Sequence, residues 1–176
     1  MNIHQPGGHL DQLLRQTRAH HVQLSSMADV KANMLLTMSS IVVTLAAPQV
    51  MKAGSQLPLV VLIIACLITI MLAAYAVMPK MPFRAGGPHP APDPQSPGFN
   101  LLFFGDFTQL DYPQFEAAME AMLNDPSRAY EVQVREIYTL GSFLAKTKYH
   151  YLRLAYVTFI TGIVASALTL LFTNIR

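Results

Sequence analysis

The stretch ADVKANMLLTMSSIVVTLAAPQV, residues 28–50, decides the fold because it changes from charged to apolar within a few residues. Asp29 and Lys31 lie at its start, and no charged side chain follows as far as Val50. A bilayer core about 30 Å thick needs roughly 20 helical residues. The stretch therefore predicts a membrane-spanning helix at 32–50.

Two further stretches have the same character. Residues 58–78 read PLVVLIIACLITIMLAAYAVM and residues 154–172 read LAYVTFITGIVASALTLLF, again without a charged side chain. The first two spans are joined by MKAGSQL, which is short enough to predict a hairpin, with Ser55 as the cap of the second helix. The sequence thus predicts three membrane-spanning helices.

The composition excludes an ordinary soluble domain. Of the 176 residues, 52% are apolar and 12% are charged, and the mean hydropathy is +0.35; soluble domains carry about 25% charged residues. The single cysteine, Cys66, rules out an intrachain disulfide. The first residues, MNIHQPGGHLDQLLRQTR, lack the apolar core of a signal peptide, so all three spans are expected to remain in the mature protein.

The distribution of Lys and Arg predicts the orientation. Cytoplasmic segments next to membrane spans are enriched in these residues. Only Lys52 and Arg176 fall on one side of the predicted spans, and the other ten fall on the opposite side: Arg15, Arg18, Lys31, Lys80, Arg84, Arg128, Arg135, Lys146, Lys148 and Arg153. We therefore expect a multi-pass membrane protein whose N-terminus and long 79–153 segment are cytoplasmic and whose C-terminus lies on the opposite side of the membrane.

The segments outside the spans predict a helical cytoplasmic part. Leucines at helical spacing predict an N-terminal helix at 8–31 that continues into the first span. Prolines dominate residues 79–98, which reads as a linker. Residues 99–153 form a predicted helical region, so the fold class is an all-α membrane protein whose first and last spans extend into a cytoplasmic helical bundle.

Helix caps divide the 99–153 region. Asp111 with Gln114 predicts a capping box at the start of a short helix. Asp125 followed by Pro126 predicts the start of another. From Pro126 the chain contains no further proline, so one helix is expected to run without a break to about residue 172.

The segment NLLFFGDFTQL, residues 100–110, is too apolar for a solvated linker. One interpretation is a hydrophobic plug that folds onto neighbouring helices. The other is a ligand-facing turn, in which Gly105 allows close backbone approach and Phe103 or Phe104 offers a face for stacking.

No catalytic, cofactor or metal motif is present in the sequence. There is no GxSxG motif, Walker loop, HExxH motif or Cys/His cluster. His20 and His21 are adjacent, so on a helix their side chains point about 100° apart and do not form a pair of ligands. We expect neither an enzyme nor a cofactor.

Charged residues flank the predicted membrane surface on two helices. Counted back from each span, Asp29 and Lys148 lie at similar depths, and a charge near hydrocarbon is costly unless it is paired or reaches the interface. A structural pair of Asp29 with Lys148 or Lys146, with Lys31 and Arg153 reaching toward water, is one interpretation. The other is that some of these cations receive an anionic ligand.

Weakly polar residues form stripes within two spans. Such residues usually pack helices together, and the alternative is the lining of a pore. The stripes consist of Asn33, Thr37, Ser40 and Thr44 on the first span and Thr158, Ser166 and Thr169 on the last.

Three segments in order resemble one known family. ADVKANMLLTMSS at the first span, NLLFFGDF after the linker, and YEVQVREIYTLGSFLAKTKYHYLRLAYVTFITGIV before and within the last span are similar to the transmembrane effectors of Pycsar antiphage defence. The matching motif positions are Asp29, Lys31, Asn100, Phe103, Phe104, Gly105, Lys148 and Tyr151.

The resemblance implies a function. Such effectors sit in the bacterial inner membrane, respond to cyclic CMP or cyclic UMP made by a pyrimidine nucleotide cyclase, and damage the membrane so that the infection is aborted. We expect this chain to bind the nucleotide as a homo-oligomer in the lipid bilayer, with no nucleic acid partner. The expected ligand residues are Lys31, Phe103, Phe104, Gly105, Arg135, Tyr138, Lys146 and Lys148. A ligand-free scaffold and an accessory subunit of a membrane sensor or transporter are the alternatives.

Overall fold

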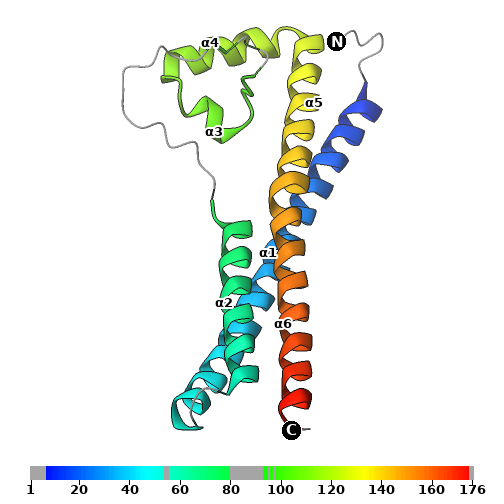
Figure 1. The fold of residues 1–176 in the computed structure, drawn as a ribbon. Coiled ribbons are helices and arrows are strands. Elements are labelled where there is room, and N and C mark those ends of the chain that lie inside the picture. Colours follow the sequence, from blue (N-terminus) through cyan, green and yellow to red (C-terminus); the bar gives the residue numbers. More distant parts are fainter. Residues whose placement is uncertain (1–6, 54–55, 80–92, 95, 97, 175–176) are drawn as a thin grey trace. The chain divides into compact units, whose positions relative to one another are not determined.

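The computed structural model describes residues 7–53, 56–79, 93, 94, 96 and 98–174. Its helices are α1 (Gly8–Ala53), α2 (Leu57–Val77), α3 (Phe104–Phe107), α4 (Tyr112–Leu123), α5 (Pro126–Phe143) and α6 (His150–Asn174), with the π-helical turn η1 (Leu144–Tyr149) between the last two. The described residues contain no strand (Figure 1), which confirms the all-α fold class.

The chain divides into two compact units. Unit 1 takes residues up to Val22 and the segment Pro79–Ser142, and unit 2 takes Gln23–Met78 and Phe143–Arg176. Helix α1 contributes its first part to unit 1 and its remainder to unit 2. The chain passes from unit 1 to unit 2 a second time just ahead of η1.

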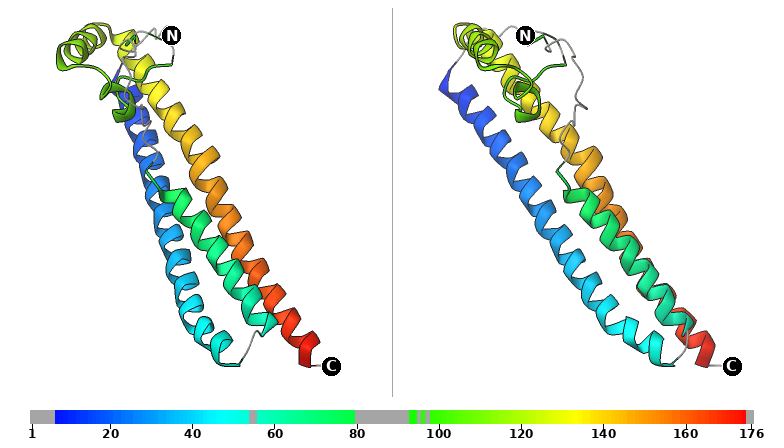
Figure 2. Two further views of the ribbon diagram at one scale, coloured as in Figure 1. Left: turned by 60° about the vertical axis from the view of Figure 1, so that its left-hand side comes forward. Right: turned by 90° about the vertical axis from the view of Figure 1, so that its left-hand side faces the viewer.

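Unit 2 is built on close contacts between small side chains. Its core consists of Ala28, Ala32, Leu35, Ala73, Leu152 and Ala155 from α1, α2 and α6. Small residues let helix backbones approach closely, which is how helices associate where no hydrophobic effect drives them together. In both views of Figure 2, α2 lies along α6. At one point the approach is so close that a Cβ atom on Gly162 would overlap the Cβ of Ala65.

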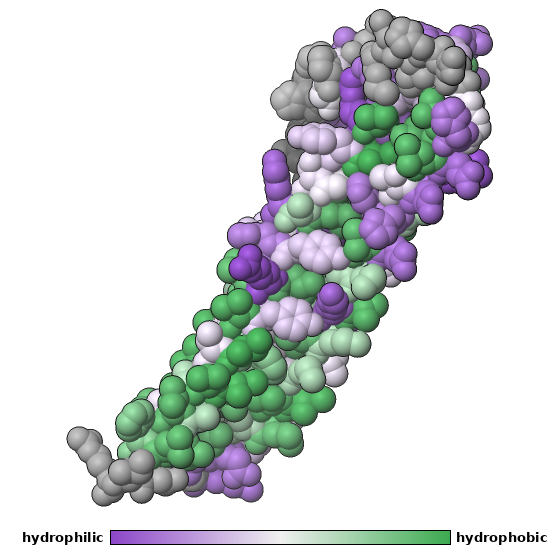
Figure 3. Space-filling model, turned by 90° about the vertical axis from the view of Figure 1, so that its right-hand side faces the viewer, coloured by the Kyte–Doolittle hydropathy of each residue, from purple (hydrophilic) through white to green (hydrophobic). Residues whose placement is uncertain are grey.

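The outer surface of unit 2 is apolar. The exposed fractions of Leu45, Met71 and Phe172 are 69%, 72% and 72%. Figure 3 shows one face of these helices, and hydrophobic side chains cover most of it. An apolar surface of this extent requires a partner other than water. The chain has three helices long and apolar enough to cross a membrane, which are α1, α2 and the helix Pro126–Thr173. The protein is therefore a membrane protein.

Unit 1 has a separate hydrophobic core. Phe99, Leu101, Ala118 and Met122 are buried in it, and Figure 1 shows α3 and α4 beside the first part of α5. Both predicted helix starts are present. Asp111 accepts a hydrogen bond from the Gln114 backbone while the Gln114 side chain accepts one from the Asp111 backbone. Asp125 Oδ1 accepts from the backbone N–H groups of the first turn of α5.

The long last helix differs from the prediction in one respect. It is continuous from Pro126 to Thr173, but its hydrogen bonding changes to the π pattern over Leu144–Tyr149. A π turn accommodates an extra residue in the helix, and such turns are often found at functional sites. The predicted cap at Ser55 and most of the predicted linker at 79–98 lie outside the described residues.

Candidate functional site

A charge cluster in unit 2 joins α1 to η1. Lys148 Nζ lies 2.6 Å from Oδ1 and 2.9 Å from Oδ2 of Asp29, and it donates a hydrogen bond to Ser25 Oγ at 2.8 Å. We call Ser25, Asp29 and Lys148 the clasp. The Lys148 side chain is 13% exposed and that of Asp29 42%, so the ammonium group is mostly withdrawn from water. Because it has three donors, these contacts can satisfy it completely.

The π turn positions the clasp. Lys148 and Tyr149 both belong to η1, and the Tyr149 hydroxyl donates a hydrogen bond to the Leu24 carbonyl at 3.1 Å. Two consecutive side chains of η1 therefore contact adjacent residues of α1. Because the π turn is wider than an α-helical turn, the side chains that follow it point in other directions than they would in a regular α-helix.

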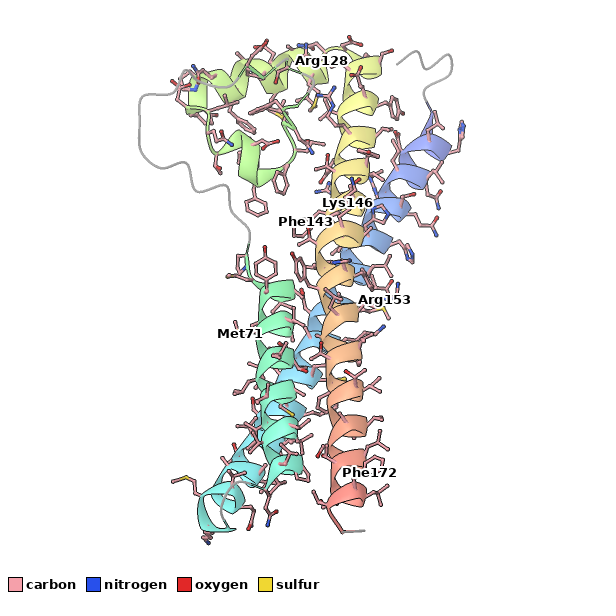
Figure 4. All side chains as sticks on the ribbon, viewed as in Figure 1. Met71, Arg128, Phe143, Lys146, Arg153 and Phe172 are labelled. Atoms are coloured by element: carbon pink, nitrogen blue, oxygen red, sulfur yellow. The ribbon has the colours of Figure 1, made fainter. Side chains whose placement is uncertain are left out.

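The other predicted cations of unit 2 are exposed. Lys31 lies on α1, Lys146 on η1 and Arg153 on α6, and all three side chains are exposed. Figure 4 labels Lys146 and Arg153 along the continuous helix. Among the predicted cations of unit 2, Lys148 is the one that the structure places in the clasp.

The Phe-rich turn in unit 1 is held by its own polar groups. Asp106 Oδ2 accepts a hydrogen bond from the Asn100 backbone at 2.9 Å, and Asn100 Oδ1 accepts one from the Leu102 backbone at 3.1 Å. The ring of Phe103 packs over Gly105, where an added Cβ would come within 2.5 Å of the ring. A glycine at position 105 therefore leaves room for the Phe103 ring within the turn. The neighbouring Phe104 is 52% exposed.

The remaining predicted ligand residues are on α5. Arg135 donates to the carbonyl oxygens of Ser96 and Phe99 at 3.2 and 3.1 Å and pairs with Glu131 at 3.0 Å. Its guanidinium thus holds the segment ahead of α3 against α5. Tyr138 is 71% exposed.

The eight predicted ligand residues consequently divide between the units. Unit 1 holds Phe103, Phe104, Gly105, Arg135 and Tyr138, and unit 2 holds Lys31, Lys146 and Lys148.

Two polar contacts between α1 and α5 were not expected from the sequence. In unit 1, Tyr130 donates a hydrogen bond to Asp11 Oδ1 at 2.6 Å, and Arg18 Nη2 lies 3.1 Å from Glu136 Oε1. Asp11 and Tyr130 are 119 positions apart, as are Asp29 and Lys148 in unit 2. Counting back from the spans places Asp29 level with Lys148. Continuing the same count along both helices places Asp11 level with Tyr130.

A cavity of about 430 Å³ adjoins the Arg18–Glu136 pair. Residues from α1, α4 and α5 line it, together with Leu102. Glu136 is only 8% exposed, and burial raises the pKa of its carboxyl group while the nearby Arg18 opposes that change. A buried carboxyl group with a perturbed pKa beside a cavity marks a candidate functional site.

The predicted polar stripes occupy different environments. On α1, Asn33, Thr37, Ser40 and Thr44 are all exposed in the single chain, and both threonine hydroxyls bond to carbonyl groups of their own helix. Ser39, outside the stripe, is the serine that is buried.

The α6 stripe faces its neighbour in part. Ser166 donates a hydrogen bond to the Pro58 carbonyl of α2 at 2.9 Å, and Thr158 and Thr169 are half-buried. Two residues of the α1 stripe, Asn33 and Thr37, line an apolar groove of about 880 Å³ together with Tyr156 and Phe159 of α6.

A family pattern covers most of the chain. The Pycsar effector protein domain matches residues 12–173, which include the clasp and every residue of the cavity lining except Asp11. The chain belongs to the Pycsar effector protein domain family. The resemblance seen in the sequence is thereby confirmed. Membership supports the role of an antiphage effector of the non-catalytic, membrane-inserted kind. The family implies a cyclic nucleotide as the activating signal. No curated protein and no solved structure matches the chain.

Proposed function

We propose that this chain is an inner-membrane Pycsar effector that responds to cyclic CMP or cyclic UMP by disrupting the membrane and aborting the infection. The observation that carries this proposal is the family match over residues 12–173 of a chain with three membrane-length helices. Ten of the twelve Lys and Arg residues fall on the same side of the predicted spans as the N-terminus, which favours a cytoplasmic N-terminus and a periplasmic C-terminus. Unit 1 would then face the compartment in which the nucleotide is made.

The clasp is the element on which we propose that the signal acts. A ligand can shift an equilibrium only if it binds two states of the protein differently. Lys148 is held by Asp29 and Ser25 in the described state, so a state with an open clasp would have a free cation. Helix α1 passes from unit 1 to unit 2 just before Ser25, and the last helix does so just before η1. A change in either helix in unit 1 would therefore reach the clasp directly along the chain.

The predicted ligand residues keep distinct roles in this proposal. Lys31, Lys146 and Lys148 are cations for an anionic ligand or lipid at the membrane surface. Phe104 and Tyr138 are exposed aromatic side chains on unit 1.

A homo-oligomer is the proposed active form. A single copy has too few spans to enclose a conducting path, and Asn33 and Thr37 face outward beside the apolar groove. A carboxamide in contact with hydrocarbon is costly, and it is satisfied when helices pair through such residues. A second copy packed on this face would supply that pairing.

Dye release from liposomes tests the function. The purified full-length chain is reconstituted into liposomes of bacterial lipids loaded with a fluorescent dye, and cyclic CMP, cyclic UMP or cyclic AMP is added. Release is expected with one or both pyrimidine nucleotides and not with cyclic AMP. A chain that inserts but releases no dye with either pyrimidine nucleotide would contradict the proposal and favour a scaffold role.

A further inference from the structure

The cavity in unit 1 has the composition of a small-molecule site. Such sites usually measure roughly 300–1,000 Å³ and combine an apolar wall with a few convergent polar groups. This cavity measures about 430 Å³. Leu14, Leu102, Met119 and Ile137 contribute to its apolar wall, and its polar groups are Asp11, Arg15, Arg18, Gln133 and Glu136.

Glu136 is incompletely neutralised where it stands. Its side chain is 11% exposed, and its ion pair is with Arg18, whose own side chain is 55% exposed. A buried carboxylate is costly unless donors surround it. Its two oxygens can accept about four hydrogen bonds, so the contact through Oε1 leaves acceptor capacity at the cavity. A ligand with an amino group would supply the missing donors.

We propose that this cavity, between α1, α4 and α5, is the nucleotide pocket, and that Glu136 and Arg18 bind the base edge of cyclic CMP in preference to that of cyclic UMP. The inference rests on the proposed function for the class of ligand, and it adds the location and the choice of base.

The choice of cytosine follows from the order of donors and acceptors. Cytosine presents an exocyclic amino group next to two acceptors, N3 and O2. Carboxylates accept hydrogen bonds from this amino group, and arginine donates to acceptors. Glu136 and Arg18 lie 3.1 Å apart, so an acceptor and a donor stand side by side. Uracil presents a carbonyl oxygen where cytosine has the amino group, and this oxygen would face the Glu136 carboxylate.

The rest of the cavity suits the remainder of the ligand. Met119 and Met122 line the wall, and methionine sulfur makes favourable contacts with aromatic rings. Arg15 precedes Arg18 by three residues on α1, which places the two on one face of the helix. Arg15 is exposed at the cavity, where its guanidinium can bind the cyclic phosphate.

Calorimetric titration of the detergent-solubilised full chain tests this assignment. Wild type, Glu136→Gln and Arg15→Met are each titrated with cyclic CMP and cyclic UMP. Glu131→Gln is the matched control, because Glu131 lies on the same helix and pairs with Arg135 away from this cavity. Circular dichroism and gel filtration establish that each variant is folded.

The expected pattern separates the base from the phosphate. Wild type should bind cyclic CMP more tightly than cyclic UMP. Glu136→Gln should weaken cyclic CMP roughly tenfold to a hundredfold and leave cyclic UMP less affected, since the charged acceptor for the cytosine amino group becomes a neutral amide. Arg15→Met should weaken both nucleotides equally, and Glu131→Gln should change neither.

The contrary results distinguish the two proposals. If wild type binds neither nucleotide, the nucleotide response of the proposed function is contradicted. If wild type binds but Glu136→Gln binds both nucleotides unchanged, or if cyclic UMP binds more tightly than cyclic CMP, this inference fails and the proposed function stands. Leu14→Trp provides a second variant, because it fills the cavity and keeps every polar group. It should abolish binding of both nucleotides, and unchanged binding would overturn the location.

Discussion

Lys148 Nζ contacts both carboxylate oxygens of Asp29, at 2.6 and 2.9 Å, and it does so from a π-helical turn. The two residues are 119 positions apart, and their contact joins the first and last long helices within unit 2. Ser25 shares the same ammonium group at 2.8 Å. Together with the hydrogen bond from Tyr149 to the Leu24 carbonyl, this lysine ties α1 to η1.

Breaking the clasp should destabilise unit 2. Lys148→Ala leaves Asp29 without its cation, and we expect the free energy of unfolding to fall by about 1–3 kcal/mol. The double variant Asp29→Asn with Lys148→Met should recover part of that loss, because no unpaired charge remains. Thermal unfolding in detergent measures both. Lys146→Ala, an exposed lysine on the same turn, is the control, and an equal loss there would show that the clasp contributes nothing particular.

The contact between Gly162 and Ala65 should be intolerant of added volume. Gly162→Ala places a methyl group on the Ala65 Cβ, so α2 and α6 must separate. Overpacking of this kind costs about 1–3 kcal/mol. Adding Ala65→Gly to the same chain should restore the melting temperature, since the total volume at the contact is then unchanged. If the double variant melts as low as Gly162→Ala, steric overlap is not the cause.

Glu136 should make stability depend on pH. Burial raises the pKa of this carboxyl group in the folded protein above its ordinary value of 4.5, with Arg18 opposing the shift. Between the ordinary and the raised pKa, the folded state binds more protons than the unfolded state. The free energy of unfolding therefore falls as pH rises through this window.

Glu136→Gln should remove that contribution. Its melting temperature should exceed that of wild type above the window, and its dependence on pH should be flatter. Melting curves from pH 4 to 8 measure this, and Glu131→Gln should follow the wild-type profile. If Glu136→Gln shows the same dependence of melting temperature on pH as wild type, the assignment to Glu136 is contradicted.

The outward face of α1 should contact a second copy in the bilayer. With Cys66 replaced by Ala, Asn33→Cys should form a disulfide-linked dimer on oxidation in membranes. Met71→Cys is the control, because Met71 is 72% exposed on α2, away from this groove. Cross-linking at both positions to the same extent would indicate random collision. Asn33→Leu should weaken the association, as measured by the size of the detergent-solubilised particle.

The sequence was sufficient for the helices and insufficient for the cavity. Long apolar runs and the caps at Asp111 and Asp125 depend on local pattern, and the structure contains the corresponding helices. The register between α1 and the last helix can be counted from the predicted spans, and this count places Asp29 level with Lys148. The π turn could not be predicted, since it depends on which side chains of α1 and η1 meet.

The cavity could not be predicted because it depends on three helices at once. Arg18 and Glu136 each look like ordinary surface charges in the sequence, and Glu136 becomes buried only when α1 covers α5. For the segment around Gly105 the sequence leaves open a hydrophobic plug and a ligand-facing turn, and the structure adds that the Phe103 ring packs over this glycine. A glycine in a sequence can indicate that another group packs closely against the backbone, but it does not show whether that group is a ligand or a side chain of the protein.

Helices α2 and α6 are joined at three places along their length. Ser166 donates to Pro58, Gly162 meets Ala65, and the rings of Tyr75 and Tyr151 stack edge to face with centroids 4.5 Å apart. Because these contacts run along both helices, we expect α2 and α6 to move together. A rearrangement of unit 2 that keeps these contacts must move α1 against the pair, and the reach of the Lys148 side chain toward Asp29 helps to set how far α1 can slide.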